Sequence, residues 1–231
     1  MNRIHPTAII DHTVVIGDGN IIGPFAVLLG NLEVGNDNWI GPHTAIGTPA
    51  QMRGGPHVAT WDGDVHPAGI AIGHRNVIRE FSTIHSGTID VTRVGNDCYF
   101  MTQAHVPHDA QIEDSVTLSN SAQLGGHTIV QQGANIGLGA VVHQRSLIGT
   151  RAMVGMGAVV TKEIPPFGMA YGSPARVRGA NVIGMQRAGL DESLIAKVVA
   201  ALNEQNNDLL RVLIPNEMAA FDEAAKYQQR H

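Results

Sequence analysis

Residues 94–130 decide the fold: VGNDCYFMTQAHVPHDAQIEDSVTLSNSAQLGGHTIV contains an apolar residue at every sixth position. The same six-residue spacing runs from Ile4 to Ile46, then breaks, and restarts from Ile72 to Ile84. After a four-residue slip it continues from Val94 to Val160. Across these three runs, 23 positions at the six-residue spacing contain no polar residue. A short, fixed period of this kind is typical of a repeat architecture.

Two further features accompany the apolar residue. A glycine often follows it, as at Gly41 and Gly137, and a small residue often stands two positions before it, as at Ala104 and Ala122. Helices repeat every 3.6 residues and half-buried strands every two, so neither explains the pattern. We predict an all-β solenoid, a parallel β-helix of hexapeptide repeats, with three hexapeptides in each triangular coil and seven to eight coils. We expect the glycines to lie at tight corners.

Length and composition exclude several classes of protein. A chain of 231 residues leaves room for one large domain or for one domain with an appendage. The net charge of −5 argues against a nucleic-acid binder held by phosphate contacts. The single cysteine, Cys98, excludes an internal disulfide and a zinc site built from several thiolates. No export signal is recognisable and no stretch approaches 18 apolar residues, so we expect a cytoplasmic protein without a membrane span.

Several stretches of the sequence, beyond the repeat itself, are similar to those of a known family. They are IREFSTIHSGT (78–88), AHVPHDAQI (104–112), LSNSAQLGGHTIV (118–130), VVHQRSLIG (141–149), VTKEIPPFGMAYG (160–172) and GANVIGMQRAGL (179–190). The chain resembles the UDP-N-acetylglucosamine O-acyltransferases, which carry out the first step of lipid A synthesis. The resemblance implies that the β-helix is left-handed, and that its active grooves lie between the subunits of a homotrimer.

The regular pattern divides the chain into two regions. We expect the β-helix over residues 1–184, with an extruded loop at about 47–71 that contains Trp61 and is either a binding loop or a plain insertion. Residues 185–231 form a short C-terminal α-helical region. Asp191 is a candidate N-cap, followed by an apolar face of Leu194, Ile195, Val198, Val199 and Leu202. A second helix starts near Asp208, with Leu209, Leu210 and Leu213 inward, and Pro215 stops it. Met218, Phe221 and Ala225 indicate a last short helix.

Histidines gather along one edge of the predicted prism. With 18 residues in a coil, the spacing puts His85, His105, His108, His127 and His143 on one edge of successive coils about 4.8 Å apart. They mark either a solvated corner where histidine is tolerated or a groove that needs groups titrating near neutrality. Acyl transfer from a thioester is one reaction that needs such a base, together with donors for the oxyanion.

The resemblance assigns roles to individual residues. It implies that His108 is the general base, that Asp109 orients or polarises it, and that the N–H of Gly126 stabilises the oxyanion. The acceptor would attack the thioester directly, without an acyl-enzyme and without a cofactor. The resemblance implies substrate-binding roles, with a structural role as the alternative at each position, for His85, His105, Asn120, His127, His143, Gln144, Gln51, Asn181 and Arg187.

Two other readings concern metal and charge. Clustered histidines could bind zinc, but His105 and His108 are three residues apart and would point to opposite faces of a strand, so we expect no metal site. Between Arg145 and Arg187 the chain has six basic residues and one acidic residue, Glu163. This asymmetry indicates either a solvated basic face or a site for an acidic partner, namely acyl carrier protein or the phosphates of coenzyme A or a nucleotide sugar.

A few positions depart from the family's pattern. Ser86 replaces the usual arginine, Met52 and Arg53 follow Gln51 in place of an acidic residue and a lysine, and Ala188 replaces a second arginine. These departures concern the acceptor side. Met156 stands where the family measures acyl length, and its bulk predicts a short or medium chain.

The sequence therefore leads to a ranked set of functions. The first is an acyltransferase that moves a 3-hydroxyacyl group from acyl carrier protein to UDP-N-acetylglucosamine or a related nucleotide sugar. The second is a coenzyme-A-dependent N-acyltransferase acting on an amino sugar. The third is a non-catalytic β-helix that serves as a binding module.

Overall fold

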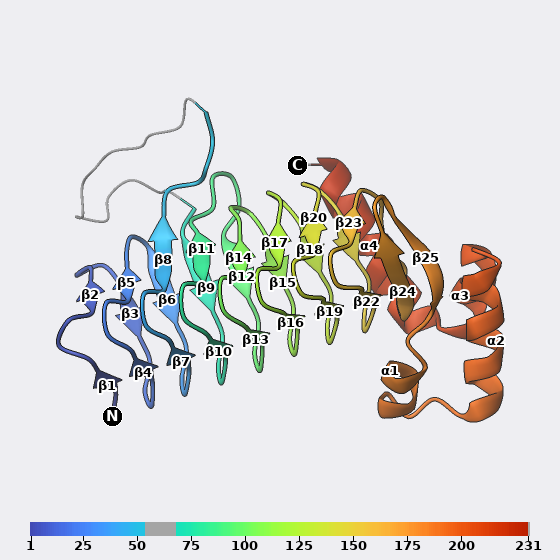
Figure 1. Ribbon diagram of the computed structural model, residues 1–231, viewed down its shortest axis with the longest axis horizontal. Helices are drawn as coiled ribbons and strands as arrows, with labels where there is room; N and C mark the ends of the chain where they lie inside the picture. The colour runs from blue at the N-terminus through green and yellow to red at the C-terminus, as the bar shows by residue number, and fades with distance from the viewer. Residues whose placement is uncertain (54–67, 231) are drawn as a thin grey trace.

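The chain coils into a parallel β-helix followed by a short helical region (Figure 1). The computed structural model describes residues 1–53 and 68–230. Its short strands stack into three sheets, which form the three sides of the coil. Sheet A contains, in stacking order, β1 (Arg3–Ile4), β4 (Ile21–Ile22), β7 (Trp39–Ile40), β10 (Val77–Ile78), β13 (Tyr99–Phe100), β16 (Thr117–Leu118), β19 (Asn135–Ile136), β22 (Met153–Val154), β24 (Gly168–Gly172) and β25 (Ala175–Ala180).

The other two sides are built in the same way. Sheet B contains β2 (Ile9–Ile10), β5 (Val27–Leu28), β8 (Ala45–Thr48), β11 (Thr83–His85), β14 (His105–Val106), β17 (Gln123–Leu124), β20 (Val141–Val142) and β23 (Val159–Val160). Sheet C contains β3 (Val15–Ile16), β6 (Leu32–Val34), β9 (Ile70–Ile72), β12 (Thr92–Val94), β15 (Gln111–Ile112), β18 (Ile129–Val130) and β21 (Leu147–Ile148). Each strand up to β24 therefore pairs with the strand one coil away, and the chain passes from sheet A to B to C in every full coil.

The six-residue period places one apolar side chain of each hexapeptide inside the coil. Ile40, Ile46 and Leu118 are fully buried, and the small residues Ala122 and Ala134 are buried beside them. The register repeats at 18 residues, because Thr117 and Leu118 of β16 pair with the first and second residues of β19. The predicted β-helix of hexapeptide repeats is confirmed.

The glycines lie at corners where successive coils come close together. A Cβ on Gly41 would lie 2.7 Å from the backbone N of Glu80, and one on Gly137 would lie 2.7 Å from the backbone N of Met156. Neither glycine has a positive φ, whereas Phe81 at a neighbouring corner has a φ of 60°. Gly41 and Gly137 each follow a strand directly and so lie at corners, as predicted, and there they allow the next coil to approach closely.

The stack extends beyond the 23 predicted positions. Ile164 forms a parallel bridge with Ile148, and Ala170 of β24 pairs with Val154 of β22. β24 then turns back into β25 as an antiparallel hairpin. The hexapeptide count missed this layer because the spacing shortens to four residues between Val160 and Ile164, and the expected number of seven to eight coils was therefore too low.

Four helices follow the last strand in the described chain. They are α1 (Val182–Arg187), α2 (Glu192–Asn203), α3 (Asn207–Leu213) and α4 (Pro215–Arg230), and the first of them begins before the expected boundary at 185. Asp191 caps α2 as predicted, accepting a hydrogen bond of 2.8 Å from the N–H of Leu194. Of the apolar face predicted for this helix, Ile195, Val198 and Leu202 are buried.

The last two helices differ from the prediction in detail. α3 is capped by Asn206, and Leu209, expected to be inward, is 37% exposed while Leu210 is buried. Pro215 was expected only to stop a helix, but it is the first residue of α4, where its missing N–H needs no partner. α4 is 16 residues long rather than short, since its sequence is rich in the strong helix formers Ala, Glu and Gln.

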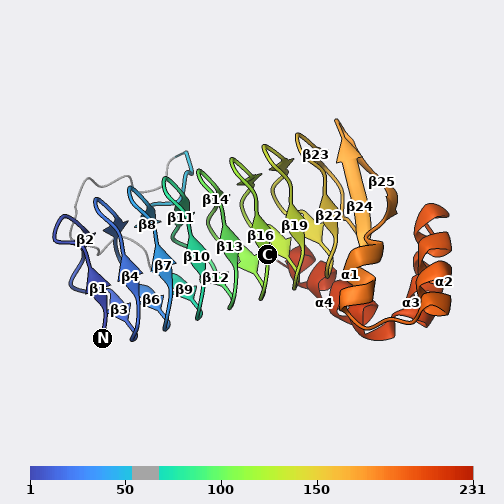
Figure 2. The same ribbon diagram turned by 60° about the horizontal axis from the view of Figure 1, so that its bottom comes forward.

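α4 turns back along the β-helix and covers part of sheet C (Figure 2). Its Met218 and Phe221 are buried in one cluster with the outward side chains Ile129 of β18 and Leu147 of β21. The C-terminal region is therefore packed against the coil near its middle as well as at its end. Among the described helices, none combines the length and apolarity that crossing a membrane requires.

The predicted loop at 47–71 falls between two strands of the described chain. β8 ends at Thr48 and β9 begins at Ile70, and residues 54–67 lie outside the described residues. Trp61 lies outside the described residues. Gln51, near the start of the predicted loop, lies within the described residues and is exposed.

Candidate active site

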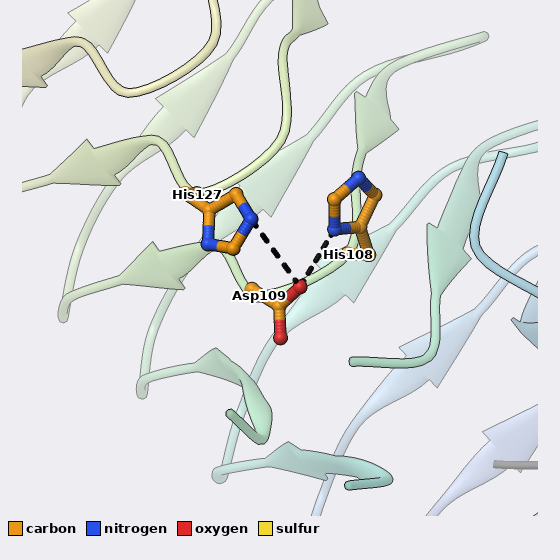
Figure 3. A group of neighbouring side chains, drawn as sticks. All are labelled: His108, Asp109 and His127. Carbon is orange, nitrogen blue, oxygen red and sulfur yellow. Dashed lines mark hydrogen bonds and ion pairs between the residues drawn. The ribbon is translucent and has the colours of Figure 1, made fainter. Parts of the chain in front are cut away.

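The turn that joins sheet B to sheet C brings His108 and Asp109 together. Asp109 has a φ of 59°, so the chain turns sharply after His108 and both side chains lie on the same side. Nδ1 of His108 and Oδ2 of Asp109 are 2.6 Å apart (Figure 3). Neighbouring residues on a regular strand would face opposite ways. The positive φ of Asp109 turns the backbone so that its side chain and that of His108 face the same way. Because Nδ1 is held by the carboxylate, Nε2 is the nitrogen that can accept a proton from a substrate.

The carboxylate of Asp109 is buried and fully hydrogen-bonded. Its Oδ1 accepts from the backbone N–H groups of Thr88, Ile89 and Asp90 at 2.8–2.9 Å, and its Oδ2 accepts from the Thr88 hydroxyl at 2.6 Å. Although burial acts to raise it, these bonds and the one from His108 hold the pKa of Asp109 well below its usual range. The pair therefore contains a permanent negative charge that can orient His108 and stabilise its protonated form.

Gly126, one coil further on, lies directly against the His108 ring. A Cβ at this position would come within 2.7 Å of both Cε1 and Nε2 of His108. Only glycine therefore leaves this side of the ring open. Within the described part of the chain, the N–H of Gly126 donates to no acceptor, while its carbonyl accepts from Arg145 N–H at 2.9 Å. This N–H is available to a bound molecule next to the proton-accepting nitrogen.

Three more histidines surround the pair. The rings of His108 and His127 meet edge to face at 5.2 Å, and Nε2 of His127 is 3.7 Å from Oδ2 of Asp109 (Figure 3). On the sheet B side, His105 forms an edge-to-face contact with His85 at 4.8 Å and a 2.8 Å hydrogen bond with the Thr83 hydroxyl.

Both His105 and His127 are held towards the neutral form. Burial lowers the pKa of His105, and the nearby His108 lowers it further. Burial also lowers the pKa of His127, where Arg145 and His108 act in the same direction and Asp109 opposes them. Neutral imidazoles at these positions can donate and accept hydrogen bonds, as a polar substrate requires.

His108, Asp109 and His127 also form the one group in the described residues whose ligand atoms gather as a metal site would require, within 4.8 Å of one another. Two ligands on a tetrahedral zinc ion, each about 2.0–2.2 Å from it, lie roughly 3.3 Å apart. The 2.6 Å between His108 and Asp109 is instead a hydrogen-bond distance, and Asp109 Oδ2 is already occupied by the Thr88 hydroxyl. The arrangement fits a proton-transfer pair better than a zinc site.

The remaining predicted residues are spread over more than one corner of the β-helix. His143 and Gln144 are exposed at the sheet B to C corner, where Nδ1 of His143 contacts the carbonyl of Gln144 at 3.0 Å. Asn120 and Met156 are exposed at the corner between sheets A and B, in the turns before β17 and β23. A single chain therefore does not bring these two residues to the His108–Asp109 pair.

Asn181 and Arg187 lie on the first helix, beyond the coil. The Asn181 side chain caps α1 by accepting from Gly184 N–H at 2.9 Å, and it also donates to the carbonyl of Arg151 at 2.8 Å, next to the corner between sheets C and A. Arg187 is exposed in the last turn of α1. The predicted residues are thus distributed over all three corners of one chain.

The residues that hold Asp109 were not predicted from the sequence. Thr88 lies within the quoted string HSGT, but its role appears only when the 86–91 segment folds over the turn after His108. Tyr227 and Gln228 of α4 were also missed: the Tyr227 hydroxyl donates to Asp90 at 2.7 Å, and Gln228 donates to the carbonyl of His127 at 3.1 Å. No local pattern marks them, because their partners are about one hundred or more residues away in the sequence.

The only cysteine offers no alternative nucleophile. Cys98 is buried in the coil, and burial raises the pKa of its thiol to about 12. A thiolate is therefore disfavoured at neutral pH, and its side chain faces the core rather than the histidines.

Comparison with known proteins identifies the family. The family description "Udp N-acetylglucosamine O-acyltransferase; Domain 2" matches residues 163–210. The acyl-[acyl-carrier-protein]--UDP-N-acetylglucosamine O-acyltransferase of Paraburkholderia phymatum is 37% identical over the whole chain and 89% of the relative. The crystal structure of the Moraxella catarrhalis RH4 UDP-N-acetylglucosamine O-acyltransferase has a TM-score of 0.74 at 28% identity, covering 97% of this chain and 96% of that one. That of Francisella novicida UDP-N-acetylglucosamine acyltransferase has a TM-score of 0.72 at 26% identity, covering 96% and 88%. The chain belongs to the UDP-N-acetylglucosamine O-acyltransferase family and is an acyltransferase.

Proposed function

We propose that this acyltransferase moves a short or medium 3-hydroxyacyl group from acyl carrier protein to a hydroxyl of UDP-N-acetylglucosamine or a related nucleotide sugar. The named relatives act on these two substrates. His108 is the general base, Asp109 orients it, and Gly126 supplies the oxyanion donor. The reaction needs no cofactor, because both the acyl group and the energy of its thioester bond come from the donor.

The proposed reaction has two steps. Nε2 of His108 removes the proton of the acceptor hydroxyl as the oxygen attacks the thioester carbonyl, and the new C–O bond gives a tetrahedral oxyanion. The N–H of Gly126 donates to that oxyanion. The C–S bond then breaks, the electron pair leaves with sulfur, and the protonated His108 returns the proton to the departing thiolate. No acyl-enzyme is formed.

One observation carries this proposal: His108 has its Nδ1 bonded to a buried carboxylate and its Nε2 beside the open backbone of Gly126. A base and an oxyanion donor on adjacent coils can face the same carbonyl carbon. The pairing of an oriented imidazole with a buried acid also keeps the correct tautomer ready for proton transfer. A non-catalytic β-helix would have no need of this combination.

The choice of acyl carrier protein as donor has support from charge. Lys162 and Arg176 line a cleft of about 360 Å³ between the end of the coil and the helices α2 and α3. Arg178 is exposed nearby and stacks its guanidinium over the ring of Tyr171 at 5.8 Å. Acyl carrier protein is acidic, so this basic end of the coil suits it electrostatically.

A homotrimer would complete the site. Met156 and Asn120 occupy a different corner from His108. If the β-helices of neighbouring subunits packed side by side, a corner of one subunit would meet a different corner of the next. Met156 is 75% exposed in the single chain, so it is free to close one end of an acyl groove shared with a second copy. Its bulk then limits the chain length, as a filled specificity pocket does.

A competition experiment tests the function. The purified protein is offered equal concentrations of acyl carrier protein and coenzyme A thioesters together with UDP-N-acetylglucosamine and a UDP-amino sugar, and products are identified by mass spectrometry. We expect the O-acylated sugar nucleotide made from the acyl carrier protein thioester. An N-acylated product made from the coenzyme A thioester would replace this proposal with the amino-sugar alternative, and no product at all would favour a binding module.

Acyl length has its own test. Met156→Gly is expected to shift the preferred donor towards longer chains, while Met156→Leu, which keeps the bulk, leaves the preference unchanged. The measurement is kcat/KM for a series of acyl carrier protein thioesters of increasing length. Unchanged selectivity in the glycine variant would remove Met156 from the site.

A further inference from the structure

The segment over residues 86–91 acts as a cradle for the Asp109 carboxylate. Three consecutive backbone N–H groups and one hydroxyl of this segment converge on its two oxygens. On the near side the segment is fixed to the coil, because Ser86 N–H donates to Thr48 and Gly87 N–H donates to Gly69. Its far side, which contains Asp90, projects towards α4.

The last turn of α4 holds this far side. The hydroxyl of Tyr227 donates to Oδ2 of Asp90 at 2.7 Å, a contact between residues 137 positions apart. The Asp90 backbone N–H in turn donates to Oδ1 of Asp109 at 2.8 Å. A short chain of contacts therefore runs from the C-terminal helix to the carboxylate that orients His108.

The neighbouring residue of α4 holds the next coil. The amide of Gln228 donates to two backbone carbonyls, those of His127 and Ser146, both at 3.1 Å. His127 contacts both members of the His108–Asp109 pair. Two consecutive residues of one helix thus contact the turns on either side of the pair.

The helix is able to act as a fixed support. Met218 and Phe221 pack the central part of the helix against Ile129 and Leu147 of sheet C, only a few residues before Tyr227. Burial and the nearby Asp90 raise the pKa of the Tyr227 hydroxyl to about 12, so it remains a donor at any pH at which the enzyme would work.

We propose that Tyr227 and Gln228 are positioning residues: the last turn of α4 fastens the 86–91 segment and the His127 turn, and through them fixes Asp109 and His108. The C-terminal helix is then a structural part of the active site and not only a cover for sheet C. The catalytic consequence rests on the function proposed above, whereas the structural coupling does not.

The structural coupling is tested in the free protein by amide hydrogen exchange. In Tyr227→Phe, the amides of Thr88, Ile89 and Asp90 are expected to exchange several-fold faster, because the segment that cradles Asp109 opens more often. Gln229→Ala, an exposed neighbour on the same helix, is the matched control and leaves them unchanged. Unaltered exchange over residues 86–91 in the Tyr227→Phe and Gln228→Ala variants would overturn the proposal, and this measurement needs no substrate.

The catalytic consequence is tested by steady-state kinetics. The Tyr227→Phe, Gln228→Ala double variant is expected to lower kcat by roughly tenfold while KM stays nearly constant, since the variant disturbs the orientation of the base and not substrate contacts. The melting temperature is followed in parallel to exclude general unfolding. Faster exchange with an unchanged kcat would overturn the positioning role, and an inactive wild-type protein would count against the proposed function alone.

Discussion

Among the proposed catalytic residues, Gly126 is the one where a substitution as small as one methyl group should disturb the reaction most. Gly126→Ala adds one methyl group that would lie 2.7 Å from two atoms of the His108 ring. We expect kcat to fall by about 100-fold or more, because the imidazole must move away from both Asp109 and the oxyanion position. The variant should fold, since neither Gly126 nor the His108 ring that the added methyl group would meet lies in the core of the coil. The comparison is kcat for Gly126→Ala against Gly179→Ala, a glycine that like Gly126 has no positive φ and whose added Cβ would meet only the flexible end of the Met169 side chain, at 3.2 Å. Equal activity of wild type and Gly126→Ala would contradict the assignment.

The buried histidines make stability depend on pH. The pKa values of His105 and His127 are lower in the folded chain than the ordinary 6.5, so below about pH 6.5 the unfolded chain binds more protons than the folded one. The free energy of unfolding therefore falls as the pH drops from 7 to below 6.5. Urea unfolding at a series of pH values measures it. His127→Gln should reduce the slope, with the exposed His5→Gln as control, and an identical slope in both would be inconsistent with burial as the cause.

At the scale of elements, an asparagine ladder stabilises the first coils. Asn38 is 1% exposed, and its side chain bonds to Asn20 Oδ1 and the Gly73 carbonyl at 3.0 Å while accepting from Asn76 N–H at 2.9 Å. Asn38→Ala leaves these buried groups without partners and should cost about 2–4 kcal/mol of unfolding free energy. Asn135→Ala, on an outward position of β19, is the control for the same substitution. Chemical denaturation that found the two variants equally stable would mean the ladder contributes nothing.

How far the elements could be predicted from sequence depends on the range of the interaction. The hexapeptide period identified the coil, because each apolar residue repeats a local pattern and Asp191 carries a local capping signal. The β24–β25 hairpin and the length of α4 escaped because the period ends before them and tertiary packing against Ile129 and Leu147 decides where α4 lies. The asparagine ladder escaped as well, since it fills the position that Cys98 and later alanines fill in other coils.

The candidate site was predictable to a similar extent. Histidine spacing and the family strings brought out His108, Asp109 and Gly126, which the structure brings into contact. The cradle at residues 86–91 and its contact with Tyr227 could not be read from the sequence, because both depend on segments that meet only after the chain has coiled and α4 has folded back.

For the whole molecule, the three-sided coil explains why one chain does not complete the predicted site. Asn120 and Met156 lie at one corner, the His108–Asp109 pair at the next, and Asn181 beside the third. A site shared between packed copies could draw residues from more than one corner, and this is the reason for proposing a homotrimer. The α4 helix covers sheet C of its own chain and supports the pair from within the same subunit.

The most direct test of the account is turnover by His108→Ala. Product formation from an acyl carrier protein thioester and UDP-N-acetylglucosamine is measured by mass spectrometry for the wild type and the variant, with circular dichroism to confirm the same fold. Loss of a general base predicts a fall in kcat of about 100- to 10,000-fold, with little change in KM. A folded His108→Ala protein that forms the acylated sugar at the wild-type rate would contradict the central claim.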